Sequence, residues 1–270
     1  MDNVAFSIFG FNIYWYAIMI VTGMILAMGI AAYLIGRKGY KPDTIIDLAL
    51  FILPLAIVGA RLYYVLTTLD RNWTFLEVLN IRSGGLAIYG GVIGGTIGLF
   101  IACRIKKFTF TNVLDMADAI IPGLILGQVI GRWGNFFNQE AYGNLVTNPD
   151  LQFFPYSVYI DNQGSWFQAT FFYESFPNFI GFLLLLFLSY KLNGKFKGLV
   201  VCGYFIWYGI VRSIVEGLRS DSLYIGSYRI SQVLSVLLVI AGIILAIIIL
   251  RNKNTDKNKD TDNTKKINNS

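Results

Sequence analysis

Arginines and carboxylates that would share one helix face are the residues of this sequence best suited to chemistry. Arg212, Glu216 and Arg219 follow one another at i, i+4 and i+7, so a helix places all three on one side. A guanidinium group presents a planar fork of donors that suits phosphate and carboxylate groups. This spacing predicts either an ion-pair ladder that only stabilises the helix or a site that binds an anion.

A second polar segment combines arginine, asparagine and glutamate where a long apolar run ends. It contains Arg132, Asn135, Asn138 and Glu140. Other polar and aromatic residues are expected at the same depth of neighbouring helices: Tyr16, Tyr89 and Glu174. Aromatic residues alone are typical of a membrane-interface belt. Because arginine and glutamate recur on several segments, the pattern favours a binding site over an isolated ion pair.

The sequence contains no histidine, which excludes an imidazole base, a histidine metal ligand and a Ser-His-Asp triad. Two cysteines, Cys103 and Cys202, lie far apart and have no Cys-x-x-Cys partner, so we expect neither a zinc site nor a redox motif. Both are expected near the inner ends of their helices, as packing residues. Chemistry in this chain therefore depends on Arg, Glu, Asp, Tyr and Asn.

The elements that would position these residues are membrane-spanning helices. Of the 270 residues, 55% are hydrophobic and 14% are charged, whereas an ordinary soluble domain has roughly a quarter charged residues. A run of about 20 apolar residues is long enough to cross a bilayer as a helix. The apolar runs predict an all-α integral membrane protein with about seven transmembrane helices, near residues 13–36, 45–69, 86–103, 112–131, 170–190, 199–217 and 230–250.

The positions of the cations predict the orientation of these spans. Lysines cluster after spans one, three and five and in the C-terminal tail, and such basic segments stay in the cytoplasm. We therefore expect the N-terminus outside and the C-terminus in the cytoplasm. The net charge of +6 forms no basic domain, so no nucleic-acid partner is expected. The outer side is left with arginines alone: Arg61, Arg71, Arg82, Arg132, Arg212, Arg219 and Arg229.

Three further segments have distinctive compositions. The external loop of about residues 133–168 has aromatic and β-branched runs around Asp161-Asn-Gln-Gly164, which predicts a small hairpin that caps the outer face between spans four and five. Residues 252–270 are too polar to fold, which predicts a disordered cytoplasmic tail after a transmembrane catalytic domain of residues 1–251. Gly84 and Gly85, at the entrance of span three, are candidates for close backbone approach to a ligand.

Several spans thus bring Arg, Glu, Asn and Tyr to one depth, in the outer half of the bilayer where a phospholipid phosphate lies. The residues by themselves predict a lipid-headgroup site with guanidinium donors for the phosphate.

At these residues the sequence resembles the prolipoprotein diacylglyceryl transferase family, from about Tyr14 to Leu250. The strongest element is Gly131-Arg-Trp-Gly-Asn-Phe-Phe-Asn-Gln-Glu140, and segments 83–91, 172–174 and 208–221 support it in the family's order. The resemblance implies a bacterial cell-membrane transferase that moves diacylglyceryl from phosphatidylglycerol to the lipobox cysteine thiol of a prolipoprotein. A thioether would form and glycerol phosphate would be released, without metal or organic cofactor.

The resemblance also implies roles for individual residues. Arg132 binds the phosphate or headgroup, and Arg212 stands at the reacting centre. Glu216 orients Arg212 or assists proton removal, and Tyr89 holds the lipid glycerol or phosphate. The catalytic set is therefore Arg212, Tyr89, Glu216 and Arg132. The substrate-binding set is Arg132, Asn135, Asn138, Glu140, Gly143, Tyr16, Gly84, Gly85, Glu174 and Arg219.

This chain departs from the family at two positions. Many relatives have histidine where Tyr89 stands and at the start of the segment that here reads Gln168-Ala-Thr-Phe-Phe-Tyr-Glu174. A mechanism with imidazole as general base cannot operate here. A guanidinium group near the incoming thiol would lower the pKa of that thiol from its usual value of about 8.5 and enrich the nucleophilic thiolate.

Two other functions fit the same composition. An anion transporter would use arginines in an outer vestibule, but its charges should be spread along a path through the membrane. A non-catalytic phospholipid-binding scaffold would bind phosphatidylglycerol without releasing glycerol phosphate.

Overall fold

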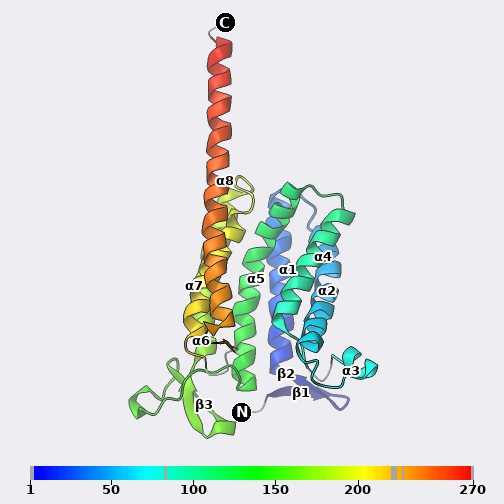
Figure 1. The fold of residues 1–270 in the computed structure, drawn as a ribbon, viewed down its shortest axis with the longest axis vertical. Helices are drawn as coiled ribbons and strands as arrows, with labels where there is room; N and C mark the ends of the chain where they lie inside the picture. Colours follow the sequence, from blue (N-terminus) through cyan, green and yellow to red (C-terminus); the bar gives the residue numbers. More distant parts are fainter. Residues whose placement is uncertain (1–2, 82–83, 220–223, 227, 269–270) are drawn as a thin grey trace. The chain divides into compact units, whose positions relative to one another are not determined.

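Helices form most of the chain in the computed structural model, which describes residues 3–81, 84–219, 224–226 and 228–268 (Figure 1). The helices are α1 (Trp15–Arg37), α2 (Thr44–Thr67), α3 (Phe75–Leu79), α4 (Ile88–Ile105), α5 (Phe110–Asn138), α6 (Thr170–Leu192), α7 (Leu199–Glu216) and α8 (Ile230–Asn268). The described residues also form three two-stranded sheets: β1 (Val4–Ile8) with β2 (Phe11–Tyr14), β3 (Ser157–Ile160) with β4 (Ser165–Gln168), and β5 (Tyr224–Ile225) with β6 (Tyr228–Arg229). Two 3₁₀ turns, η1 (Pro149–Leu151) and η2 (Asp161–Gln163), lie between α5 and α6. Four residues of the sequence motifs lie outside the described residues: Arg82, Ser83, Ser220 and Asp221.

Seven helices in the described part of the chain are long and apolar enough to cross a membrane. They are α1, α2, α4, α5, α6, α7 and the Ile230–Asn252 part of α8. This confirms the predicted all-α integral membrane protein. The predicted bounds agree closely with the observed ones except at the end of α5.

Helix α5 continues beyond residue 131, where the prediction ended span four. The prediction stopped where Arg132 interrupts the apolar run, but apolar residues continue at helical spacing through Trp133 and Phe137. The Phe137 ring stacks on Trp15 with centroids 5.1 Å apart, and Trp133 meets Phe171 edge-on at 5.3 Å. These ring contacts stabilise the added turns, so the loop between α5 and α6 begins after Asn138 and not at residue 133.

The predicted hairpin in that loop is present. Strands β3 and β4 pair antiparallel, in register from Ser157 opposite Gln168 to Ile160 opposite Ser165. Gly164 closes the turn with a left-handed φ of 62°, which favours glycine. That the hairpin caps the outer face stays a prediction. The division at residues 251 and 252 between a membrane domain and a disordered tail also stays a prediction, and α8 continues past that point.

The chain divides into two compact units, residues 1–34 with 117–270 and residues 35–116, and each is described by itself. In the unit of residues 35–116, α2 packs on α4 through glycines. A Cβ atom on Gly98 would lie 2.7 Å from the Phe51 carbonyl oxygen and 2.9 Å from Ile52 Cα. In the other unit, a Cβ on Gly123 would lie 2.8 Å from Ala27 Cα. The small residues thus bring backbones into contact, which van der Waals packing in lipid requires.

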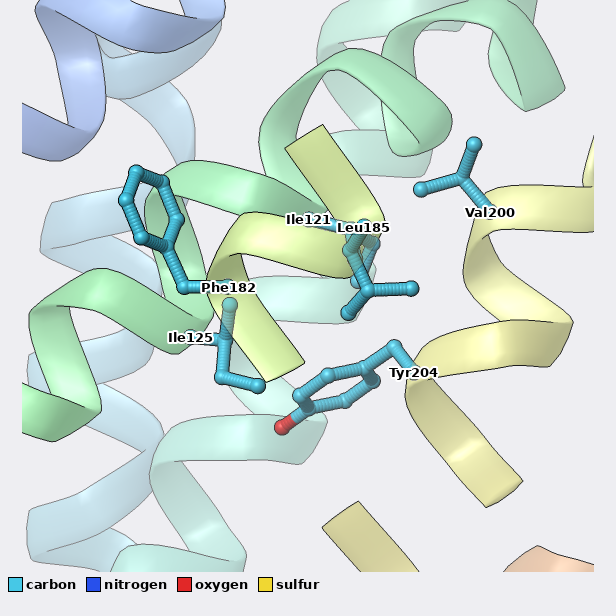
Figure 2. Packing of buried hydrophobic residues seen from close by; sticks show 6 residues of the cluster. All are labelled: Ile121, Ile125, Phe182, Leu185, Val200 and Tyr204. Carbon is cyan, nitrogen blue, oxygen red and sulfur yellow. The ribbon is translucent and has the colours of Figure 1, made fainter. Parts of the chain in front are cut away.

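The unit of residues 1–34 and 117–270 has its core where α5, α6 and α7 meet. Figure 2 shows the buried side chains of this core, which are Ile121, Ile125, Phe182, Leu185, Val200 and Tyr204. The Tyr204 hydroxyl oxygen is the only polar atom among them and accepts a hydrogen bond from Gln128 Nε2 at 2.8 Å. The core therefore holds together the three helices that carry the arginine and glutamate motifs.

A buried aspartate ties α7 to α5 at the other end of these helices. Asp118 Oδ2 accepts from the Gly198 amide at 2.7 Å, and Oδ1 accepts from the Val201 amide at 3.1 Å. These amides belong to the start of α7, where a helix leaves its N–H groups without intrahelical partners. At 1.5 Å per residue, Arg132 lies about 21 Å beyond Asp118 on α5 and Arg212 about 20 Å beyond the start of α7. The contact of Asp118 with the start of α7 therefore places Arg132 and Arg212 at about the same distance along their helices, which is their common height.

Candidate active site

A single buried carboxylate joins the two arginine motifs. Glu174 on α6 accepts from Arg132 Nη2 on α5 at 2.7 Å through Oε1, and from Arg212 Nη1 on α7 at 2.9 Å through Oε2. The Glu174 side chain is 2% exposed, whereas the arginine side chains are 21% and 14% exposed. The carboxylate thus lies inside the protein, and each guanidinium keeps part of its surface accessible.

Pairing across three helices offsets the cost of burying these charges. A charge within an apolar span is expensive unless it is paired. Arg132 and Arg212 lie before the last turns of α5 and α7, and Glu174 lies near the N-terminus of α6, which carries partial positive charge. The two ion pairs of Glu174 therefore contribute most to the stability of this arrangement.

Glu216 holds the other side of Arg212. Its Oε2 lies 2.6 Å from Arg212 Nη2, one helical turn away, and its side chain is 2% exposed. Arg229 donates to the Glu216 backbone carbonyl. Direct contacts thus link five charged residues: Arg132, Glu174, Arg212, Glu216 and Arg229. Their charges sum to one net positive charge, which suits an anion with a single negative charge. Sequence reasoning counted Arg229 among the outer arginines but did not place it in the site.

Polar side chains extend the cluster from Arg132 toward the loop between α5 and α6. Arg132 Nη1 donates to Asn135 Oδ1 at 3.2 Å, and Asn135 Nδ2 donates to Glu140 Oε1 at 2.8 Å. Asn138 Nδ2 also approaches Glu140 Oε1, at 3.4 Å. The structure therefore brings together all four polar residues that the sequence singled out in this segment.

The backbone around Gly143 is too crowded for a side chain. Gly143 forms a β-bridge with Arg219 and donates its amide to the Gln168 carbonyl at 3.0 Å. A Cβ atom on Gly143 would lie 2.9 Å from both Gln168 Cβ and Thr170 Cγ2. Gly143 and Arg219 thus fasten the segments after α5 and α7 to each other, close to the cluster.

Tyr16 lies against the same end of α5. A Cβ atom on Gly134 would lie 2.6 Å from Tyr16 Cδ2, so the ring packs directly on the glycine. The Tyr16 side of α1 therefore borders the helix turn that carries Arg132 and Asn135.

Tyr89, Gly84 and Gly85 belong to the unit of residues 35–116. The rings of Tyr89 and Tyr63 lie 6.1 Å apart. Gly84 and Gly85 have left-handed φ values, and both carbonyls accept from Arg61 Nη1 at 2.9 Å. The close backbone approach that the sequence suggested is thus made to the chain's own Arg61.

Arg61 fixes the whole segment between α2 and α4. Beyond the two glycine carbonyls, its Nε donates to the Val78 carbonyl at 3.0 Å and its Nη2 to the Glu77 carbonyl at 2.6 Å. The buried guanidinium therefore caps the C-terminal end of α3, where carbonyls lack intrahelical partners. The sequence marked Arg61 only as an arginine within a span, and its partners became apparent from the tertiary structure.

The arrangement around Glu174 can stabilise negative charge on a group that approaches the two arginines. Each guanidinium has five N–H donors, more than its partners here use. Donors held in place before a reaction stabilise developing charge without a reorganisation cost. Among the described residues, no group of three or more Cys, Asp and Glu side chains is placed to hold a metal ion.

Fold and site together define an integral membrane protein, with seven long apolar helices among the described residues and an arginine–carboxylate cluster near the ends of three of them. A sequence model described as prolipoprotein diacylglyceryl transferase matches residues 3–248. The chain belongs to the prolipoprotein diacylglyceryl transferase family, which confirms the resemblance seen in the motifs.

Similar proteins that carry the same family name match this chain over most of their length. A protein of Finegoldia magna named phosphatidylglycerol–prolipoprotein diacylglyceryl transferase is 48% identical over 248 residues, 92% of this chain and 95% of that protein. A protein of Clostridium perfringens, named phosphatidylglycerol–prolipoprotein diacylglyceryl transferase 1, is 43% identical over 254 residues, 93% of this chain and 95% of the relative. The transferase of Enterococcus faecalis is 44% identical over 260 residues, 94% and 92% of the two chains.

Proposed function

We propose that this chain transfers the diacylglyceryl group of phosphatidylglycerol to the lipobox cysteine thiol of a prolipoprotein. A thioether forms and glycerol phosphate is released. The observation that carries this proposal is the pair of guanidinium groups, from Arg132 and Arg212, that Glu174 holds side by side. The names of the relatives, which contain both substrates, support the same reaction.

The reaction is a displacement at a glyceryl carbon. The cysteine thiolate attacks this carbon, a C–S bond forms, and the C–O bond to the phosphate breaks with its electron pair moving to the phosphate oxygen. The proton lost by the thiol balances the negative charge gained by the phosphate. Positive groups that are already in place where the departing phosphate gains charge therefore lower the activation barrier of this step.

We assign the following roles to the residues, and the contacts of the arginines and glutamates support them. Arg132 binds the headgroup phosphate, and Arg212 stabilises charge at the reacting centre. Glu174 positions both guanidinium groups, and Glu216 fixes Arg212 from the other side or assists proton removal. Tyr89 takes part as a hydrogen-bond donor to the lipid, since this chain has no imidazole.

A phosphodiester with one negative charge matches the single net positive charge of the five contacting residues. The remaining predicted residues act around the headgroup. Asn135, Asn138 and Glu140 form the polar chain beside Arg132, and Tyr16 covers the same turn of α5. Gly143 and Arg219 join the segments that follow α5 and α7, and Gly84 with Gly85 shapes the entrance to α4.

The protein is a multi-pass membrane protein of a bacterial family. Within that membrane we place the N-terminus outside, the C-terminus in the cytoplasm and the arginine cluster in the outer leaflet. The basic segments after spans one, three and five support this orientation. The arginine cluster would then lie at the depth of outer-leaflet phosphates.

The test is release of glycerol phosphate by purified protein in phosphatidylglycerol liposomes, with a lipobox peptide as acceptor. Arg132→Ala and Arg212→Ala should abolish turnover while the protein stays folded. Arg71→Ala is the matched control, because Arg71 is an exposed arginine that pairs with Glu77 in the other unit. Near-normal turnover of either site variant contradicts the assignment.

The two alternative functions give different results in the same liposomes. Anion flux without any acceptor peptide would identify a transporter. Binding of phosphatidylglycerol with no release of glycerol phosphate would identify a scaffold.

A further inference from the structure

A pocket of about 360 Å³ lies between the end of α5 and the β3–β4 hairpin. Aromatic side chains form much of its wall, among them Tyr142, Phe154 and Trp166. Its volume falls in the range of about 300–1,000 Å³ that is usual for ligand sites. Glu140 belongs both to this wall and to the polar chain that leads to Arg132. The pocket is therefore next to the arginine cluster without being part of it.

The charge of the pocket is opposite to that of the cluster. Among the described residues that line it, Glu140 and Asp161 are carboxylates, and none is lysine or arginine. Such a wall suits a neutral or basic segment better than the anionic phosphate, which the arginines bind. The two neighbouring sites thus suit two different substrates, one anionic and one not.

Strand β3, whose residues line this pocket, has one backbone edge that β4 does not use. The Ala169 amide donates to the Tyr156 carbonyl, and hydrogen-bonded pairs alternate along an antiparallel ladder. The amide and carbonyl of Tyr159 therefore point away from β4. The other edge of β4 confirms this alternation, because the Trp166 carbonyl accepts there from the Val146 amide. In the described chain, β3 pairs with β4 alone.

The edge of β3 is short and has defined ends. The Ser157 amide donates to the Phe153 carbonyl at 2.8 Å, and the Asp161 amide donates to Gln139 Oε1 at 2.9 Å. Between these ends, the amide and the carbonyl of Tyr159 point away from β4; Tyr159 is 48% exposed, whereas Ser157 is fully buried. An edge of this length can pair with a stretch of a few extended residues and not with a long strand.

We propose that this pocket binds the extended segment of the prolipoprotein that follows the lipobox cysteine, by pairing with the edge of β3. The inference rests on the proposed function. The pocket is lined largely by residues outside the membrane-spanning helices, so it suits the part of the substrate outside the bilayer. Addition of a strand to a sheet edge is a general mode of peptide binding, in which alternate backbone amides bond to the protein.

The first experiment measures the affinity of the protein in phosphatidylglycerol nanodiscs for a lipobox peptide with serine in place of the reactive cysteine. Single N-methyl groups are placed on successive amides after that position. The expected result is an alternating pattern, in which every second methyl group near the pocket weakens binding about two- to ten-fold. Equal Kd values for all methylated peptides overturn the proposal.

The second experiment uses side chains of the pocket. Asp161→Asn should remove a preference for lysine over glutamate in the peptide of about two- to five-fold. Asp150→Asn, an exposed acid of the same loop outside the pocket, is its control. Phe154→Ala should weaken peptide binding, whereas Phe153→Ala, an equally exposed neighbour outside the pocket, should not. An unchanged Kd for both Asp161→Asn and Phe154→Ala in folded protein overturns the proposal.

The two proposals fail in different ways. Glycerol phosphate release by wild type with no effect of methylation or of the pocket variants leaves the transferase function intact and overturns the peptide site. Alternating peptide affinity without any glycerol phosphate supports the peptide site and contradicts the transferase function. A change in the KM for phosphatidylglycerol alone, with peptide affinity unaltered, assigns the pocket to the lipid and also overturns the peptide site.

Discussion

Replacing Glu174 with glutamine keeps the size of the side chain but removes the negative charge that Arg132 and Arg212 share. The glutamine oxygen can still accept from one guanidinium. The amide nitrogen faces the other guanidinium as a second donor, so that contact changes from attractive to repulsive. One arginine is therefore left without its partner in a largely buried place.

The size of the effect follows from the burial of Glu174, which is 2% exposed. Removing one partner of a buried ion pair costs about 3–5 kcal/mol of unfolding free energy. Losing one charged hydrogen bond that positions a catalytic guanidinium costs about 1.5–3 kcal/mol, which corresponds to a fall in turnover of roughly ten- to a hundred-fold. We expect the loss to appear in kcat, because Glu174 positions donors for charge that develops in the transition state.

The assay combines thermal unfolding in detergent with glycerol phosphate release in liposomes at varied phosphatidylglycerol content. Glu77→Gln is the matched control, since Glu77 also pairs with an arginine but is exposed. That control should leave turnover unchanged, and its effect on stability should be confined to α3, where Glu77 accepts from Thr74. Glu174→Gln protein with wild-type stability and wild-type kcat would refute the reasoning that this carboxylate positions the two arginines.

Three further changes have defined outcomes. Gly143→Ala puts a methyl group 2.9 Å from Gln168 Cβ and should cost about 1–3 kcal/mol in detergent unfolding, with reduced turnover. Asp118→Ala removes the acceptors at the start of α7 and should cost about 1–2 kcal/mol and lower kcat, because the height of α7 is no longer fixed. The amide and hydroxyl of Thr74 hold the pKa of Glu77 below its ordinary value of 4.5. Protection of α3 amides from hydrogen exchange should therefore be full at neutral pH and decline as the pH falls below about 4.5. Thr74→Ala removes the hydroxyl but keeps the residue 74 amide, so it should weaken that dependence.

The membrane architecture could be predicted from the sequence, because span length and apolar content are local properties. The seven spans agree with the observed helices except at the end of α5, where ring contacts from α1 and α6 extend the helix past Arg132. No local pattern reveals such contacts, since their partners are distant in sequence. The β3–β4 hairpin was predictable for the same reason as the spans, from its turn and its flanking residues.

The sequence predicted which residues belong to the candidate site, but not which of them contact one another. Spacing on one helix placed Arg212 and Glu216 together, and they are in contact. Glu174 was chosen as one residue among several at the same depth, and only the rotation of α6 between α5 and α7 makes it the shared partner of both arginines. Arg61 shows the same limit, because its four carbonyl partners come from a segment at least 16 residues away.

The sequence by itself determined that this chain crosses a membrane, that it has no imidazole, and which arginines lie among the apolar spans. Those properties depend on residue type and on neighbours close along the chain. Only the tertiary structure decided that Glu174 joins Arg132 to Arg212, that Asp118 sets their common height, and that an acidic pocket lies beside them. These features depend on how helices distant in sequence are rotated and shifted against one another, and burial makes each pairing strong enough to matter.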